Sequence, residues 1–165
     1  MPCKQGRPPR KPEIPDTYRS HIEVARKQVS IYDGPVVLAE GLAKFPSYVG
    51  DLLAVHWFLL EHQNGGLEQF FLNPTGILAP EVIKGFTNMG LQTAADSLEK
   101  CCRIFGDSYP RNLEDREVIL LRLCKATDPR EVMAAEPFKK EGDVIEAISR
   151  QILLRMNECA TDQKG

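Results

Sequence analysis

The stretch from Ala54 to Gly76, AVHWFLLEHQNGGLEQFFLNPTG, decides the fold. Residues 52–60 around its beginning are apolar except for His56, which is too apolar for a helix with only one face against a core. A polar stop with two glycines follows, and then Leu67, Phe70 and Phe71 recur at helical spacing. This order predicts a helix buried on most sides, a tight corner and a short second helix.

The corner itself has the composition of a helix end. Asn64 or Gly65 is expected to adopt the left-handed conformation that ends many helices. Gly66 then allows the second helix to begin without a side chain in the bend. A second turn at residues 73–76 follows, where Pro fixes one torsion and Gly frees another.

Helix signals continue on both sides of this stretch, and no segment shows the sustained alternation of a β-strand. Helices are expected to start at Asp16, Asn112 and Asp128, each as an N-cap. A fourth is expected to start at a capping box formed by Thr93 and Asp96. Expected buried stripes are Ile22, Ala25, Val29 and Tyr32; Val118, Leu121 and Cys124; and a last helix from Asp143 with Ile145, Ile148, Ile152, Met156 and Cys159. The sequence predicts an all-α compact domain over residues 16–165, with seven or eight short helices around a buried central helix that contains Trp57.

Length and composition fit this single domain. With 165 residues and 42% hydrophobic residues, the chain can bury a sizeable core. No apolar run approaches the roughly 20 residues that a membrane helix needs, and no apolar segment follows the charged N-terminus, so no secretory signal is expected. Five cysteines without C-x-x-C spacing fit a reducing compartment. The cytoplasm is the expected location, and the adjacent Cys101 and Cys102 are expected to be structural thiols.

Residues 1–15 predict a Pro-rich, basic and disordered arm. The chain has a net charge of −2, and because the first twelve residues contribute +4, the remainder carries −6. The tripeptide at residues 6–8, Gly-Arg-Pro, resembles the centre of a minor-groove hook, but Gln5 stands where such hooks have an arginine. Four positive charges give only weak, salt-sensitive binding, so direct nucleic-acid binding is not expected.

No catalytic, metal or cofactor motif is evident in the sequence. His56 and His62 lie six positions apart, which puts them on different sides of a helix, and no H-E-x-x-H is present. His56 within an apolar run predicts a hydrogen-bonded core histidine. Neither a P-loop nor G-x-G-x-x-G occurs. We therefore expect no enzyme, no metal and no cofactor, and an enzyme with an unrecognised site stays open as an alternative.

The corner also carries a family resemblance. The run E-H-Q-N-G-G-L-E-Q-F-F-L-N resembles the Glu-x-Asn-Asn-Gly-Gly-Phe-x-Gln-Phe/Tyr-Phe-x-Asn signature of the bacterial family of the nineteen-kilodalton DNA-mimic protein, a domain of unknown function in most members. The matching residues are Glu61, Asn64, Gly65, Gly66, Gln69, Phe70, Phe71 and Asn73. Gln63 and Leu67 replace the signature's first Asn and its Phe, and the looser resemblance runs from Val36 to Cys159.

Two roles are open for the polar residues of this signature. They can form a site for a ligand or for a partner's backbone, or they can satisfy the exposed amides of two helix ends and one another. We favour the structural role, because a corner between two helices leaves many amides to satisfy.

The resemblance implies imitation of DNA, and the charge pattern opposes that implication. A mimic needs carboxylates spaced like phosphates with few cations among them. The candidate partner-binding acids are Glu114, Asp115, Glu117, Glu131 and Asp143. Basic residues are interleaved with them, namely Arg111, Arg116, Arg122, Arg130, Lys139 and Lys140.

We therefore expect a non-enzymatic protein-binding domain of the immunity or regulatory type, which occludes a partner protein. The alternative is a DNA mimic that blocks a DNA-binding protein or transcription factor. The expected partner is another protein, such as a DNA-binding protein or a toxin. A homodimer also stays open.

Overall fold

The computed structural model describes residues 16–163, so the basic arm lies outside the described residues. Within them the chain forms α-helices, one 3-10 helix and no strand, which confirms the all-α fold class. The helices are α1 (Arg19–Gln28), α2 (Gly34–Leu42), α3 (Ser47–Leu72), η1 (Pro74–Leu78), α4 (Ala79–Asn88), α5 (Gln92–Arg103), α6 (Leu113–Leu123), α7 (Pro129–Val132), α8 (Lys139–Ala147) and α9 (Ser149–Asp162).

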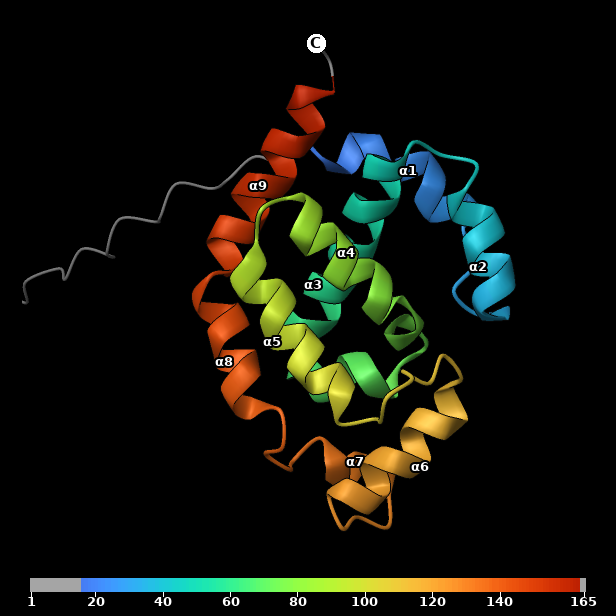
Figure 1. Ribbon diagram of the computed structural model, residues 1–165, viewed down its shortest axis with the longest axis vertical. Coiled ribbons are helices and arrows are strands. Elements are labelled where there is room, and N and C mark those ends of the chain that lie inside the picture. The colour runs from blue at the N-terminus through green and yellow to red at the C-terminus, as the bar shows by residue number, and fades with distance from the viewer. Residues whose placement is uncertain (1–15, 164–165) are drawn as a thin grey trace, which may run out of the picture.

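Helix α3 is the axis of the domain, and α1, α4, α6, α8 and α9 all contact it (Figure 1). Its buried residues come from every side of the helix between Val49 and Leu59, as the apolar run predicts. Trp57 is only partly buried and packs against the outside of the core. Helix α5 packs between α4 and α8, and α7 extends from α6 at one end. No helix in residues 16–163 is long and apolar enough to cross a membrane.

The corner in α3 is present, but a different residue makes it. Gly65 has φ −155° and ψ 20°, and Gly66 has φ 76° and ψ −167°. The prediction of a left-handed Asn64 or Gly65 is therefore wrong, because the chain turns through a positive φ at Gly66. With that ψ, Gly66 occupies a region that residues with a Cβ avoid, so glycine is required there.

Aromatic rings from both arms of the corner fill the core. Phe58 makes T-shaped, edge-to-face contacts with Phe70 and Phe86. The ring centroids are 4.9 and 5.5 Å apart, and the interplanar angles are 81° and 90°. Phe71 lies 4.9 Å from Phe105 and 5.3 Å from Phe138 between ring centroids. These spacings and tilts are favourable for aromatic pairs, so the corner holds α4, α5 and the segment before α8 around one cluster.

Two of the predicted helix caps are confirmed and two are wrong. The Asn112 side chain accepts from the backbone amide of Glu114, and Asp128 forms a capping box with Glu131. Helix α1 begins at Arg19 rather than at Asp16, whose carboxylate pairs with that arginine at 2.8 Å. Helix α5 begins at Gln92, so Thr93 already lies inside its first turn and caps nothing.

The predicted stripes also need correction at three places. Helix α1 ends at Gln28, so Tyr32 lies beyond it and is 77% exposed. Helix α6 faces inward through Arg116 and Leu120, whereas Val118 is 54% exposed. The expected last helix is two helices, because Ile148 between α8 and α9 has non-helical torsions. The break at Ile148 adds one helix, and the described residues form nine α-helices rather than seven or eight.

Candidate functional site

The polar residues of the signature converge on the carboxylate of Glu61. Its Oε2 accepts hydrogen bonds from Gln69 Nε2 at 2.7 Å and Asn73 Nδ2 at 2.9 Å, and its Oε1 accepts from Thr75 Oγ1 at 3.1 Å. The carboxylate therefore joins the two arms of α3 to η1 through side chains rather than through backbone amides.

The remaining signature residues divide between core and surface. Phe70 and Phe71 are fully buried, and Gln63 and Asn64 are exposed. The signature residues with buried or partly buried polar side chains thus bond to one another at the corner. That geometry fits a structural role, and it leaves little of Glu61 for a ligand.

Beside this corner lies a buried arginine that the sequence reasoning did not single out. Arg116 of α6 has no exposed surface. Its Nε donates to the carbonyl of Phe71 at 3.0 Å, and its Nη2 donates to that of Asn73 at 3.0 Å. Its Nη1 donates to the carbonyls of Pro110 at 3.2 Å and Arg111 at 2.8 Å. All four acceptors are neutral, so the guanidinium is held by peptide dipoles rather than by a carboxylate.

Gly76 leaves the space that this arginine occupies. A Cβ at position 76 would lie 2.8 Å from the carbonyl oxygen of Phe70 and 2.9 Å from Arg116 Nε, both too close for van der Waals contact. The Tyr109 hydroxyl donates to the Gly76 carbonyl at 2.7 Å, and burial raises the pKa of this phenol. The corner of α3, the 3-10 helix η1 and the start of α6 are therefore joined by hydrogen bonds into one unit.

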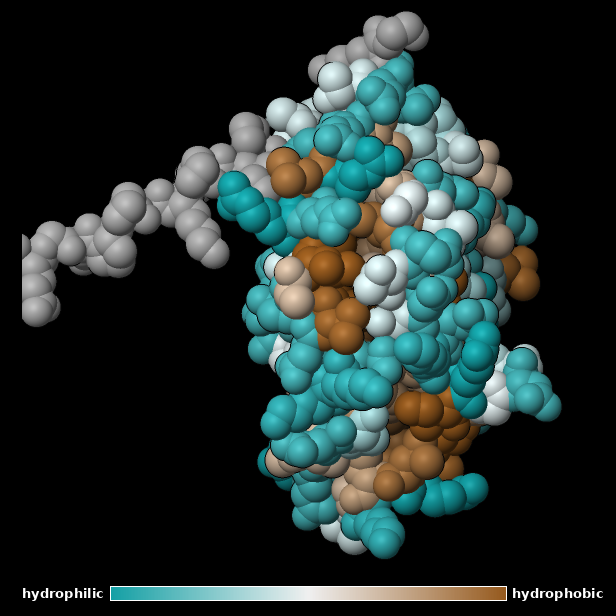
Figure 2. Space-filling model, turned by 60° about the vertical axis from the view of Figure 1, so that its left-hand side comes forward, coloured by the Kyte–Doolittle hydropathy of each residue, from teal (hydrophilic) through white to brown (hydrophobic). Residues whose placement is uncertain are grey.

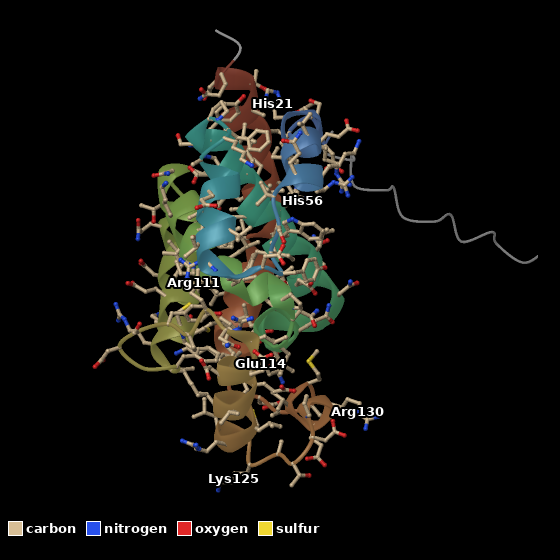
Figure 3. The ribbon with its side chains drawn as sticks, turned by 90° about the vertical axis from the view of Figure 1, so that its right-hand side faces the viewer. His21, His56, Arg111, Glu114, Lys125 and Arg130 are labelled. Carbon is tan, nitrogen blue, oxygen red and sulfur yellow. The ribbon has the colours of Figure 1, made fainter. Side chains whose placement is uncertain are left out.

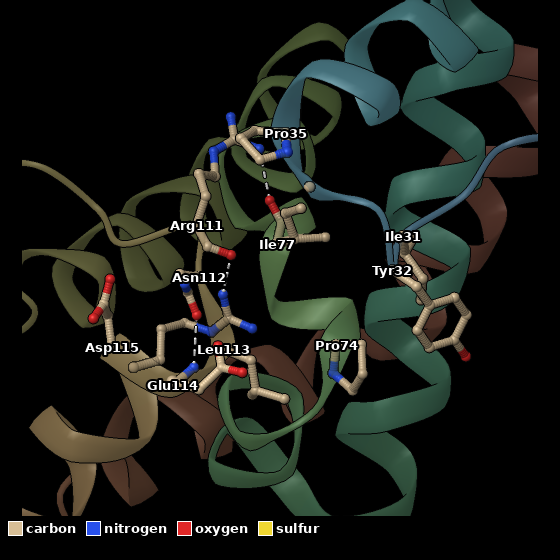
Figure 4. Close-up of a pocket in the computed structure, with 12 residues that line it drawn as sticks. Ile31, Tyr32, Pro35, Pro74, Ile77, Arg111, Asn112, Leu113, Glu114 and Asp115 are labelled. Carbon is tan, nitrogen blue, oxygen red and sulfur yellow. Dashed lines mark hydrogen bonds between the residues drawn. The ribbon is translucent and has the colours of Figure 1, made fainter.

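A groove of about 560 Å³ lies on the outside of this unit (Figure 4). One wall comes from the link between α1 and α2, with Ile31, Tyr32 and Pro35, and the floor includes Pro74 and Ile77. The other wall is the segment 111–116 that begins α6. Tyr32 is 77% exposed, so most of its aromatic side chain lies free on the surface beside the groove.

Charge in the groove is arranged asymmetrically. Arg111 donates to the Ile77 carbonyl at 2.6 Å and makes two hydrogen bonds to the Glu81 carboxylate at 2.8 and 3.0 Å. Its charge is therefore matched within the protein. Glu114 and Asp115 also line the groove and are exposed at the start of α6, where the helix dipole favours acids. The free charge that this groove presents is negative.

The five acids predicted to bind a partner do not form one surface. Glu114 and Asp115 lie together at the groove, and Glu117 is partly buried one turn further along α6. Glu131 accepts from the backbone amides of Thr127 and Asp128, so it caps α7. Asp143 lies on α8, where it lines a second hollow with residues of α3.

Cations pair with other acids near these five. Figure 3 places Lys125 and Arg130 at the far end of α6 and α7 from Glu114 and Arg111. Arg130 donates to both carboxylate oxygens of Asp128, at distances from 2.6 to 3.2 Å. Similar pairs join Glu136 to Lys139 at 2.9 Å and Glu141 to Lys100 at 3.8 Å. Asp128, Glu136 and Glu141 therefore each have a cation beside them.

The two central histidines lie apart, as their spacing predicts. His56 is 4% exposed and its Nδ1 lies 3.0 Å from the Tyr18 hydroxyl, which confirms the hydrogen-bonded core histidine. Burial is the main cause that lowers its pKa to about 4. His62 faces α8 instead and lies 3.2 Å from the Gly142 carbonyl through Nε2. In residues 16–163, no three His, Cys, Asp or Glu side chains group as a metal ion requires.

The adjacent thiols are core residues. Cys101 and Cys102 are both buried, and burial raises the pKa of each to about 12. Thiolate is the reactive form of cysteine, so neither group has the character of a nucleophile at neutral pH.

Comparisons with known proteins place the chain in a family. Neither the curated proteins nor the solved structures contain a significant match to this chain. The profile of the DMP19-like protein family matches residues 43–154. That range covers most of the described domain, including α3 with its corner, the groove's floor and α6. The chain therefore belongs to the DMP19-like protein family.

Proposed function

We propose that this protein is a non-enzymatic protein-binding domain that occludes a surface of a partner protein, with the groove beside α6 as its contact. The observation that carries the proposal is Tyr32, which is 77% exposed and lines an apolar-floored groove, across which Glu114 and Asp115 have no ion pair within residues 16–163. Tyrosine is enriched at the centres of protein interfaces because it combines a large apolar ring with a hydrogen-bonding tip.

The neighbourhood of Tyr32 extends this surface. Val36 and Val37 at the start of α2 are 68% and 41% exposed, so the apolar area continues past the wall of the groove. Glu114 and Asp115 supply an acidic rim on the opposite side. A mixed patch of this kind fits a partner that presents apolar side chains flanked by basic ones.

Imitation of DNA is the second candidate, because the family resemblance implies it and because Glu114 and Asp115 have no cation bonded to them in residues 16–163. The ion pairs of α7 and α8 with Arg130, Lys139 and Lys100 weigh against it, since cations beside carboxylates weaken a phosphate-like field. Figure 2 likewise shows hydrophobic patches among the hydrophilic residues on the side of α8 and α9.

The test is capture of partners by the full-length chain, followed by affinity measurement with each partner identified. Tyr32→Ser should weaken binding by about tenfold or more, as loss of an interface aromatic does. Leu154→Ser is the control, because Leu154 is 44% exposed on α9 and does not line the groove. Equal effects of the two substitutions on affinity would show that the groove is not part of the interface.

Salt dependence separates the two candidates. We expect an occluding domain with an apolar contact to lose little affinity between about 50 and 200 mM salt, and duplex DNA not to compete. A loss of about 100-fold or more over that range, with displacement by DNA, would instead assign the protein as a mimic.

A further inference from the structure

A second hollow of about 360 Å³ lies between the corner of α3, the segment before α8, and α8 itself. Leu67 and Phe138 form its apolar base, and each is 1% exposed. The charged residues that line it are Glu68, Glu136, Asp143, Glu146 and Lys139. Lys139 is paired to Glu136 at 2.9 Å, so the remaining three carboxylates give the hollow a negative charge.

His62 supplies a polar atom that the protein does not satisfy. The side chain is buried, with the residue 7% exposed, and its Nε2 lies 3.2 Å from the Gly142 carbonyl. A carbonyl can only accept, so Nε2 must carry the hydrogen, and in the neutral ring Nδ1 is then an acceptor. No donor among residues 16–163 reaches Nδ1. Its nearest charged neighbour is Glu146 Oε2 at 3.7 Å, which is an acceptor as well.

Protonation of the ring is disfavoured. Burial lowers the pKa of His62 more than the nearby carboxylates of Glu146 and Asp143 raise it. Phe58 stacks on the ring with centroids 5.7 Å apart and an interplanar angle of 24°, which keeps water from that face. Two acceptors, Nδ1 and the Glu146 carboxylate, therefore face one another at neutral pH without a donor between them.

Glu68 adds a second, deeper charge to the hollow. It is 9% exposed, and its carboxylate lies over the corner, where a Cβ on Gly66 would be 2.9 Å from Oε2. Burial raises its pKa, and no cation of residues 16–163 is paired with it. A buried carboxylate without a cation gains when a positive group is placed beside it.

We propose that this hollow binds a guanidinium group. Nδ1 of His62 has almost no accessible surface, so the Glu146 carboxylate, whose side chain is 65% exposed, must swing aside for the guanidinium N–H donors to bridge Nδ1 and that carboxylate while the positive charge faces Glu68. A guanidinium fits better than a compact ammonium, because its planar fork presents several donors in fixed directions to separate acceptors. The exposed side chain of Met133 at the rim can cover the alkyl stem of such a group.

The occupant that we assign is an arginine side chain of a partner protein, and this assignment rests on the proposed protein-binding function. The rim favours a side chain over a free metabolite, since Met133 and Ala134 offer apolar surface to a stem while the acids receive its tip. A free guanidinium compound would use the same donors, so the experiment must separate the two sources.

The experiment is an NMR titration of the full-length protein with N-acetylargininamide, in which the nitrogen resonance of His62 Nδ1 is followed. We expect saturable binding in the millimolar range with a shift of that resonance, because Nδ1 gains a hydrogen bond. N-acetylcitrullinamide keeps the shape and loses the charge, so it should not saturate. Equal binding of the two compounds, or an unmoved Nδ1 resonance, would overturn the proposal.

Two matched variants on α8 check the site. Glu146→Gln should weaken binding about fivefold or more, the effect of one partly exposed charge pair. Glu141→Gln makes the same charge change, but Glu141 pairs with Lys100 and does not line the hollow, so it should change binding less than about twofold. An equal loss in both variants would reduce the effect to general electrostatics and refute the site.

The source is decided by comparison of a blocked Gly-Arg-Gly peptide with methylguanidinium. Tighter binding of the peptide supports a protein partner, and tighter binding of methylguanidinium would overturn that assignment. None of these titrations uses the groove or its partner. Their failure is therefore distinguishable from failure of the proposed function, which the Tyr32→Ser measurement tests.

Discussion

Replacement of Arg116 by methionine tests how the signature corner is held. Methionine is similar in length and apolar, so it fills much of the same space without donors. The change removes four hydrogen bonds and leaves the carbonyls of Phe71, Asn73, Pro110 and Arg111 without that partner.

The expected cost follows from these contacts. A buried acceptor that loses its partner costs about 1–3 kcal/mol, but Pro110 and Arg111 are only partly buried, so we expect water to replace the arginine at their carbonyls. Removal of an unpaired buried charge offsets part of the loss. We expect a net decrease of about 3 kcal/mol in the free energy of unfolding, which for a domain of this size lowers Tm by about 6–12 °C.

Urea denaturation followed by circular dichroism measures this quantity directly. Arg122→Met is the matched control, because Arg122 lies on the same helix and is exposed, so its free energy of unfolding should stay within about 0.5 kcal/mol of wild type. Arg116→Lys should fall between, since one ammonium cannot reach all four carbonyls. A loss below about 1 kcal/mol for Arg116→Met would show that the carbonyls are satisfied without the arginine.

Three further outcomes are expected from other parts of the corner and core. Gly66→Val should lower the free energy of unfolding by about 2 kcal/mol or more, because valine resists the positive φ of this residue; an unchanged urea midpoint would contradict the torsion argument. Glu61→Ala should cost about 1–3 kcal/mol, since three side-chain donors lose their acceptor, whereas full stability in the same assay would contradict it. His56 has a folded pKa of about 4, below its unfolded value, so the unfolded chain binds the proton more tightly. Stability should therefore be complete above about pH 6.5 and decrease toward about pH 4, and His56→Gln should flatten this part of the profile measured by thermal melts; an identical profile in the variant would assign the acid sensitivity to other groups.

Local signals predicted some helix ends and missed others, since Asp16 and Thr93 do not cap their helices. Asn112 and Asp128 were identifiable as caps because a cap depends on residues two or three positions away. The buried run of α3 and the existence of the corner followed equally from composition. The choice of Gly66 over Gly65 did not, because adjacent glycines tolerate the same torsions and only the packing of both helix arms selects one.

The site shows the opposite case, in which distant residues decide. Arg116 lies on the stripe that Leu113 and Leu120 define at helical spacing, and this position is the only sign of its burial in the sequence. Two of its four acceptors are carbonyls more than forty positions away. The groove likewise joins residues near position 32 to residues near 114, a proximity that depends on how α1, α3 and α6 pack.

The corner has a consequence for how the domain opens. Between residues 113 and 132 only Arg116, Leu120 and Val132 are buried, while α3 alone buries many side chains. Elements with few buried groups unfold at a smaller free energy than the rest of the protein. We therefore expect helices α6 and α7 to open as one unit once the Arg116 guanidinium leaves its carbonyls, and their amide hydrogens to exchange together, well before those of α3. Helix α6 contributes one wall of the groove. A partner that binds there should therefore slow the amide hydrogen exchange of α6 and α7.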